Sequence, residues 1–187
     1  MFVQLWYNSY FVSESSSRWK GFKMPSVYVE TTIPSYLTAA PSRDLVTAGR
    51  QQVTHDWWRT ARARFELFTS EAVLQEMRAG DPEAAAKRLK LVEGLTILDV
   101  TKEVDSLAEI YQQRFDLPLR AKMDIVHIAV AVVYELDYVV TWNCKHIANW
   151  QILRLLTEVN HSLGRFTPLL CTPDELLELP TQEGDAS

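Results

Sequence analysis

The chain alternates between short apolar runs and longer stretches whose apolar residues recur at helical spacing. β-Branched and aromatic residues fill runs at 27–30, 65–69, 96–100, 138–142 and 166–173, which predicts five strands. Between them, apolar residues return every three or four positions, as on one face of a helix. Strands that alternate with helices are typical of βαβ crossovers. The pattern therefore predicts an α/β fold with a central, mostly parallel sheet and helices on both faces.

Capping residues predict where several helices begin. Thr31 or Thr32 can cap a helix that has Pro34 in its first turn. Ser70 is a good N-cap for "EAVLQEM", and Pro82 can start the next helix. These signals place turns directly after the first two predicted strands.

Two longer helices are predicted from spacing. The first covers 45–62, with inward side chains at Val46, Val53 and Trp57, and its Trp-Trp-Arg segment is interpreted as one buried tryptophan beside a solvated basic face. The second runs from Cys144 to a stop at Gly164. Asn143 would be the N-cap of this second helix.

Length and composition bound the class of protein. A chain of 187 residues fits one domain, and 47% apolar with 23% charged residues is typical of a globular protein. The net charge of −5 argues against a broad basic surface for nucleic acid, but not against a nuclease with a local acidic metal pocket. Two widely separated cysteines favour a reducing cytoplasm, and no apolar run is long enough to span a membrane.

The ends of the chain differ in pattern from the middle. Residues 1–23 are aromatic and serine-rich without a strand or helix period, and we expect a loosely ordered extension there. Met24 opens the first patterned segment. We therefore expect one domain over 24–180 and a short tail at 181–187.

Polar side chains stand where apolar elements end. Glu30 closes the first predicted strand, and Asn143 follows the strand at 138–142. Asp124 lies in the first turn of an apolar helix, and Glu76 lies on the inner side of the helix after Ser70. Ligands of open α/β sheets bind outside the carboxyl ends of the strands, so these four side chains could meet. Three acids and one carboxamide, without clustered His or Cys, suit Mg²⁺ or Mn²⁺ better than Zn²⁺.

Four segments in order resemble the PIN-domain family, the fold of VapC-type toxins of toxin–antitoxin pairs. They are "VYVETTI", "SEAVLQEM", "KMDIVHIAVAV" and "DYVVTWNCKHI", and the resemblance covers residues 27 to about 177. It implies a divalent-metal-dependent endoribonuclease of the cytoplasm that hydrolyses RNA phosphodiester bonds. The implied metal ligands are Glu30, Glu76 and Asp124, with Asn143 as a further catalytic residue.

The resemblance also implies supporting residues and partners. Thr141, Lys145 and His146 would support the site, and Lys122 and Arg120 flank it where they could contact phosphates. The implied cofactor is Mg²⁺ or Mn²⁺, and the implied partners are RNA, a cognate antitoxin protein and a second copy in a homodimer. No membrane partner is expected.

Two departures from the family pattern keep an alternative open. Glu30 replaces the usual aspartate, and Asn143 stands where a fourth acid is common. Asn143 could hold a metal-bound water through its carbonyl oxygen, or it could serve only as a helix cap. The helix dipole alone would favour Asp124 in a first turn. The alternative is therefore a PIN-like protein with weak or no catalysis that binds nucleic acid or protein.

The histidines near the acids have an ordinary interpretation as well. His127 follows Asp124 by one helical turn, and His146 follows Asn143 by a similar distance. Either could serve a metal or act as a general base, but hydrogen-bonded packing is the commoner role for a lone histidine near a helix start. A flap-type DNA nuclease is disfavoured, because the sequence has no segment that suggests a helical arch or a DNA clamp.

Overall fold

A computed structural model describes residues 24–115 and 121–179. The expected extension at 1–23, the tail at 181–187 and Arg120 all lie outside the described residues. The domain boundaries predicted from the sequence therefore stay a prediction.

The described residues contain one five-stranded sheet in which every strand pair is parallel. The strand order is β3-β2-β1-β4-β5. The strands are β1 (Ser26–Val29), β2 (Glu66–Ser70), β3 (Thr96–Leu98), β4 (Tyr138–Val140) and β5 (Leu169–Cys171). Each strand overlaps the run that predicted it. The predicted α/β class and its parallel sheet are confirmed.

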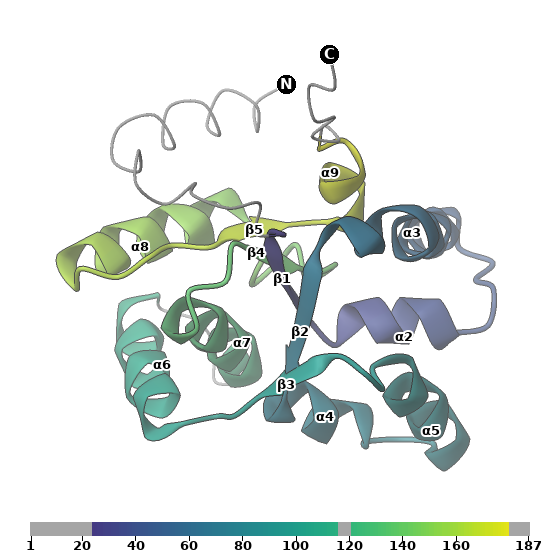
Figure 1. Ribbon diagram of the computed structural model, residues 1–187, viewed down its shortest axis with the longest axis horizontal. Helices are drawn as coiled ribbons and strands as arrows, with labels where there is room; N and C mark the ends of the chain where they lie inside the picture. The colour runs from purple at the N-terminus through teal and green to yellow at the C-terminus, as the bar shows by residue number, and fades with distance from the viewer. Residues whose placement is uncertain (1–23, 116–120, 180–187) are drawn as a thin grey trace.

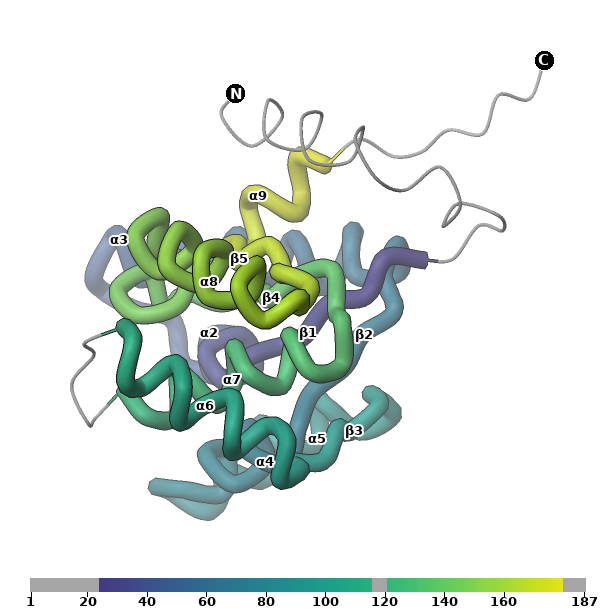
Figure 2. The backbone as a smooth tube through the Cα atoms, turned by 90° about the vertical axis from the view of Figure 1, so that its left-hand side faces the viewer, coloured from purple at the N-terminus to yellow at the C-terminus, as the bar shows by residue number. Residues whose placement is uncertain are grey.

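Helices cover both faces of this sheet (Figures 1 and 2). In Figure 1, α6, α7 and α8 lie on one side of the strands, and α2 and α3 lie on the other. The bounds are α2 (Thr32–Thr38), α3 (Leu45–Asp56), α4 (Glu71–Met77), α5 (Pro82–Leu91), α6 (Lys102–Arg114), α7 (Lys122–Val133), α8 (Trp150–Ser162) and α9 (Pro173–Leu177).

The central strand β1 is buried on both faces, which explains the apolar run from Val27 to Val29. Val27 and Val29 pack into a cluster with Trp57 and residues of α2 and α9. Tyr28 points to the opposite face, into the larger cluster built by α4, α6, α7 and α8. Successive side chains of a strand point to opposite faces, so one short run serves two cores.

Helix α7 is the most apolar helix and lies within the larger core. Every residue from Ile125 to Val132 is buried. Asp124 stands in its first turn, as the sequence predicted. The buried body of α7 therefore holds this carboxylate at a fixed place beside the sheet.

The predicted helix over 45–62 is wrong in part. Helix α3 ends at Asp56 and continues as a π-helical turn (Trp57–Ala61) and a 3₁₀ turn (Arg62–Arg64). Trp57 is buried as expected, but Val46 is 65% exposed. The buried residues of α3 are Gln51 and Thr54, and the Gln51 amide bonds the backbone at 40 and 42. Because hydrogen bonds rather than apolar contacts fill the inner face, apolar spacing misplaced Val46.

The predicted helix from Cys144 is also wrong at its start. Residues 144–147 form turns, and α8 begins at Trp150 with Asn149 as its N-cap. The Asn149 side chain accepts a hydrogen bond from the backbone N–H of Gln151 at 2.8 Å. The cap is therefore Asn149, not Asn143, while the stop at Gly164 is confirmed by its φ of +65°. Within the two described ranges, no helix has the length and hydrophobicity needed to cross a bilayer.

Candidate active site

The carboxyl ends of β1 and β4 form the switch point of the sheet. From β1 the chain proceeds to β2 on one side, and β4 pairs with β1 on the other side. Glu30 directly follows β1, and Thr141 directly follows β4. This is the place where open α/β sheets form a binding crevice.

Glu30 is 4% exposed, and three hydrogen bonds hold its carboxylate. Oε2 accepts from the Thr32 backbone N–H at 3.0 Å and from the Thr32 hydroxyl at 2.6 Å. It also accepts from the Thr141 hydroxyl at 2.7 Å. All three donors reach Oε2, so they fix the carboxylate while Oε1 is not engaged by them. Donors of this kind supply the partners that a buried carboxylate requires.

Glu76 is reached from two sides. Its Oε2 accepts a hydrogen bond from the Thr31 hydroxyl and another from His127 Nε2, the latter at 3.0 Å. The Glu76 side chain is 30% exposed, whereas that of His127 is fully buried. One oxygen of Glu76 is thus bonded toward the interior, while part of the side chain is exposed to solvent.

His127 continues inward as a chain of hydrogen bonds. Its Nδ1 lies 2.8 Å from the Tyr28 hydroxyl, which lies 2.7 Å from the Ser70 hydroxyl. Ser70 in turn caps α4 by accepting from the backbone N–H of Val73. The interpretation of His127 as a hydrogen-bonded packing residue is correct, but its partner is one of the predicted site acids.

Asp124 belongs to a second, neighbouring set of contacts. Its Oδ1 accepts from the Asn143 amide at 2.8 Å, and its Oδ2 lies 3.0 Å from His146 Nδ1. The Asn143 carbonyl oxygen accepts from the His146 backbone N–H at 3.0 Å. Asn143 therefore orients Asp124 and caps a turn, with part of its carbonyl capacity already used.

The structure brings some of the predicted ligands together more closely than others. Among the described residues, Glu30, Glu76 and His127 offer ligand atoms that all lie within 4.8 Å of one another. Asp124 is not part of that group. His127 Nε2 already bonds Glu76, so the Oε1 atoms of Glu30 and Glu76 are the ligand atoms that these hydrogen bonds leave available. Carboxylate oxygens fit a hard ion such as Mg²⁺ or Mn²⁺, and Asp124 would have to approach to complete the set.

A scan against models of protein families and a search of curated proteins found no match to this sequence. Solved structures do resemble it. A chain of the VapBC2 complex from Rickettsia felis, bound to a promoter DNA fragment, matches with a TM-score of 0.52 and 13% identity over 78% of this chain and 97% of that one. This chain has the PIN-like fold of VapC-type proteins.

Two further solved structures resemble this chain with lower TM-scores. VapC20 of Mycobacterium tuberculosis, a toxin that cleaves the sarcin–ricin loop, has a TM-score of 0.49 and 19% identity over 61% of this chain and 87% of that one. A chain of VapBC-1 from nontypeable Haemophilus influenzae has a TM-score of 0.49 and 11% identity over 79% and 98%.

Burial and pairing shift the pKa values of Asp124, Glu76 and His127. Burial raises the pKa of Asp124 above its usual range, against the opposing effect of His146. The pKa of Glu76 is lowered, because the bonds from His127 and Thr31 outweigh its burial. The pKa of His127 is raised, because its bond to Glu76 and the nearby carboxylates outweigh complete burial. The ionised form of Glu76 and the protonated form of His127 therefore stabilise each other.

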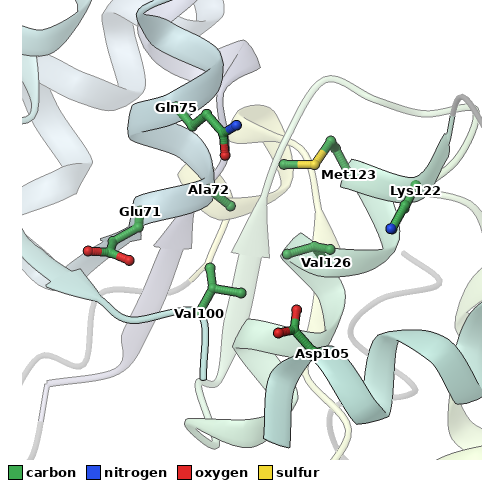
Figure 3. A pocket seen from close by; sticks show the side chains of 8 residues that line it. All are labelled: Glu71, Ala72, Gln75, Val100, Asp105, Lys122, Met123 and Val126. Carbon is green, nitrogen blue, oxygen red and sulfur yellow. The ribbon is translucent and has the colours of Figure 1, made fainter. Parts of the chain in front are cut away.

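Two of the basic residues predicted to flank the site, Lys122 and Lys145, lie within the described ranges. Lys145 is exposed. Lys122 lines a separate pocket of about 260 Å³ between α4 and α7, with Met123, Val126 and Asp105 among its other lining residues (Figure 3). None of the acids predicted as metal ligands lines this pocket.

The sequence pointed to His127 as a packing residue, a metal ligand or a general base, but not as a partner of Glu76. His127 stands three residues after Asp124, so both side chains project from neighbouring positions of α7 toward the acids. Its spacing was visible in the sequence. Its partner was not, because Glu76 lies 51 positions away.

Proposed function

We propose that this protein is a divalent-metal-dependent endoribonuclease and the toxin of a toxin–antitoxin pair. The observation that supports the proposal most is the convergence of Glu30 and Glu76 at the switch point of a parallel sheet. Asp124 and Asn143 stand beside them and are joined by a hydrogen bond. Carboxylates gathered from separate elements at this edge of a PIN-like fold suit metal-assisted hydrolysis of a phosphodiester.

Glu30, Glu76 and Asp124 would hold Mg²⁺ or Mn²⁺. A bound ion of this class lowers the pKa of a water and offsets the charge that develops on the phosphate. The hydroxyls of Thr32 and Thr141 hold the buried Glu30 in place for this task. Metal affinity would rise with pH as Asp124 loses its proton, since burial raises the pKa of that carboxyl.

The side chains around the acids have separate tasks in this proposal. Asn143 orients Asp124 through its amide N–H, and His146 holds the other oxygen of that carboxylate. Lys145 is exposed next to this pair, where it can contact a phosphate of the RNA. In this proposal the hydrogen-bonded acids would bind the metal, and the exposed Lys145 would contact the RNA.

A protein partner follows from the same proposal. The similar structure from Rickettsia felis is a VapBC2 complex, so we propose that this chain also binds a cognate antitoxin protein. A homodimer in the cytoplasm is part of the same proposal. Co-expression of this chain with the open reading frame next to its own, followed by size-exclusion chromatography, would test both partners.

The nuclease assay uses purified protein, single-stranded and structured RNA, and Mg²⁺, Mn²⁺ or EDTA. The variants are Asp124→Asn and Glu76→Gln, and the control is Glu103→Gln, whose carboxylate pairs with Arg165 on the surface. We expect cleavage with metal by the wild type and the control, and none by the two site variants. Cleavage in EDTA, or full activity of Asp124→Asn, would contradict the proposal.

One observation favours a second function. Asp124 lies outside the closely spaced group and is engaged by Asn143 and His146. A site locked in this arrangement would bind RNA or protein without cutting. Retention of RNA on the folded protein, with no cleavage in any metal, would favour this binding module over the nuclease.

A further inference from the structure

The bonds behind Glu76 form a continuous chain from the start of α4 to the candidate site. In order, the chain contains Ser70, Tyr28, His127 and Glu76, with steps of 2.7, 2.8 and 3.0 Å. The first three side chains are fully buried. The four members of this hydrogen-bond chain come from β1, β2, α4 and α7, and three of them are not acids.

The direction of these bonds follows from what each group can donate. An ionised Glu76 carboxylate only accepts, so His127 Nε2 carries a hydrogen and donates it. In neutral His127 the other nitrogen accepts, so the Tyr28 hydroxyl donates to Nδ1 and accepts from Ser70. The Val73 backbone N–H then completes the chain by donating to Ser70. In this arrangement each of the four groups donates one hydrogen bond. The Nε2–H of His127 points at Glu76 whether the imidazole ring is neutral or charged.

We propose that Tyr28 and His127 are positioning residues that hold Glu76 Oε2 in place and thereby build the cation site. The proposal rests on the proposed metal-dependent function. Glu76 is one-third exposed on a short helix, and its side chain has several rotatable bonds. The two donors on Oε2, the Thr31 hydroxyl and His127 Nε2, select one orientation among these and leave Oε1 for the ion.

The same geometry makes His127 a poor metal ligand. Its Nε2 lies within 4.8 Å of both glutamates, yet it already donates to Glu76, and its Nδ1 is occupied by Tyr28. An N–H that donates has no lone pair for a metal. This chain of hydrogen bonds therefore favours a hard ion bound by oxygen ligands and disfavours Zn²⁺ bound through the His127 imidazole.

The test measures Mn²⁺ affinity by calorimetry and by the electron paramagnetic resonance signal of bound Mn²⁺, without RNA. Tyr28→Phe removes only the hydroxyl, and Tyr111→Phe is its matched control. Tyr111 is equally buried and bonds Asn160 at 2.5 Å away from the acids. His127→Leu removes the donor to Glu76, whereas His127→Gln keeps an N–H at a comparable reach.

We expect the dissociation constant for Mn²⁺ to rise about 10-fold or more in Tyr28→Phe and His127→Leu, as for other partners of metal ligands. It should be unchanged in Tyr111→Phe and largely restored in His127→Gln. Folding of each variant is checked by circular dichroism. If the wild type binds Mn²⁺ and all variants bind equally well, the positioning role is wrong while the metal site stands. If the wild type binds no Mn²⁺, both are wrong.

Discussion

Thr141→Val tests how the buried end of β4 holds Glu30. The Thr141 side chain is fully buried, and valine has nearly the same shape. The threonine hydroxyl donates to Glu30 Oε2 at 2.7 Å and accepts from the Asn143 backbone N–H at 2.9 Å. The substitution therefore removes one donor and one acceptor from a site that water does not reach freely.

The expected cost can be worked out from these two bonds. A hydrogen bond to a charged group contributes about 1.5–3 kcal/mol to stability. The Asn143 N–H belongs to a partly exposed residue, so its loss adds only about 1 kcal/mol. The extra buried methyl group recovers roughly 0.8 kcal/mol. We expect the free energy of unfolding to fall by about 2–3 kcal/mol, which lowers Tm by roughly 4–12 °C for a protein of this size.

Urea unfolding followed by circular dichroism measures this change, and Thr157→Val is the control. Thr157 also donates its hydroxyl at 2.7 Å, but to the carbonyl of Leu153 within α8. The control should differ from the wild type by no more than about 0.5 kcal/mol. If Thr141→Val is as stable as the control, the Thr141 hydroxyl does not hold Glu30 and the reasoning is wrong.

Two further predictions concern charge and backbone. The Glu76–His127 pair stabilises the fold fully between about pH 4.5 and 6.5, the ordinary pKa values of the two groups. Because the pKa of Glu76 is lowered in the folded protein, this stability is lost as the pH falls through the folded-state pKa of Glu76. Because the pKa of His127 is raised, the stability is also lost as the pH rises through the folded-state pKa of His127. Urea titrations in EDTA should show the largest difference between wild type and His127→Leu in that window, and a difference that is flat from pH 4 to 9 would refute it. Gly164→Ala should lower the free energy of unfolding by about 1 kcal/mol, because φ is +65° at this position. Gly49→Ala, inside α3, should raise it by about 1 kcal/mol in the same urea titration. Equal effects of the two substitutions would contradict the left-handed conformation of Gly164.

The sheet was predictable because its signals are local. Val27 to Val29 and Tyr138 to Val140 are apolar on both faces, and only a strand covered on both sides explains such runs. Capping at Ser70 and the stop at Gly164 also depend on neighbours within a few residues. The position of Glu30 at the end of its strand followed from the same pattern.

The pairings within the site were not predictable in this way. Glu76 bonds His127 across 51 positions, and Glu30 bonds Thr141 across 111. The helix start predicted at Cys144 was wrong, because the Asn143 side chain bonds Asp124 and the His146 backbone N–H, while Asn149 caps α8. The sequence pattern predicts which residues lie at the same edge of the sheet. Which of these residues form contacts depends on the packing of the folded protein.

The pairing of β1 with β4 also has a consequence for synthesis of the chain. Glu30 leaves the ribosome early, but Thr141, which helps to hold it, follows 111 positions later. The central strand pair cannot close before residues 138–140 have emerged, since Val27 to Val29 pair with them in register. A nascent chain therefore carries Glu30 without its bond from Thr141 until the strand at 138–140 has emerged. A protein that cuts RNA only with an assembled cluster would be harmless to its own message until that strand pair has formed.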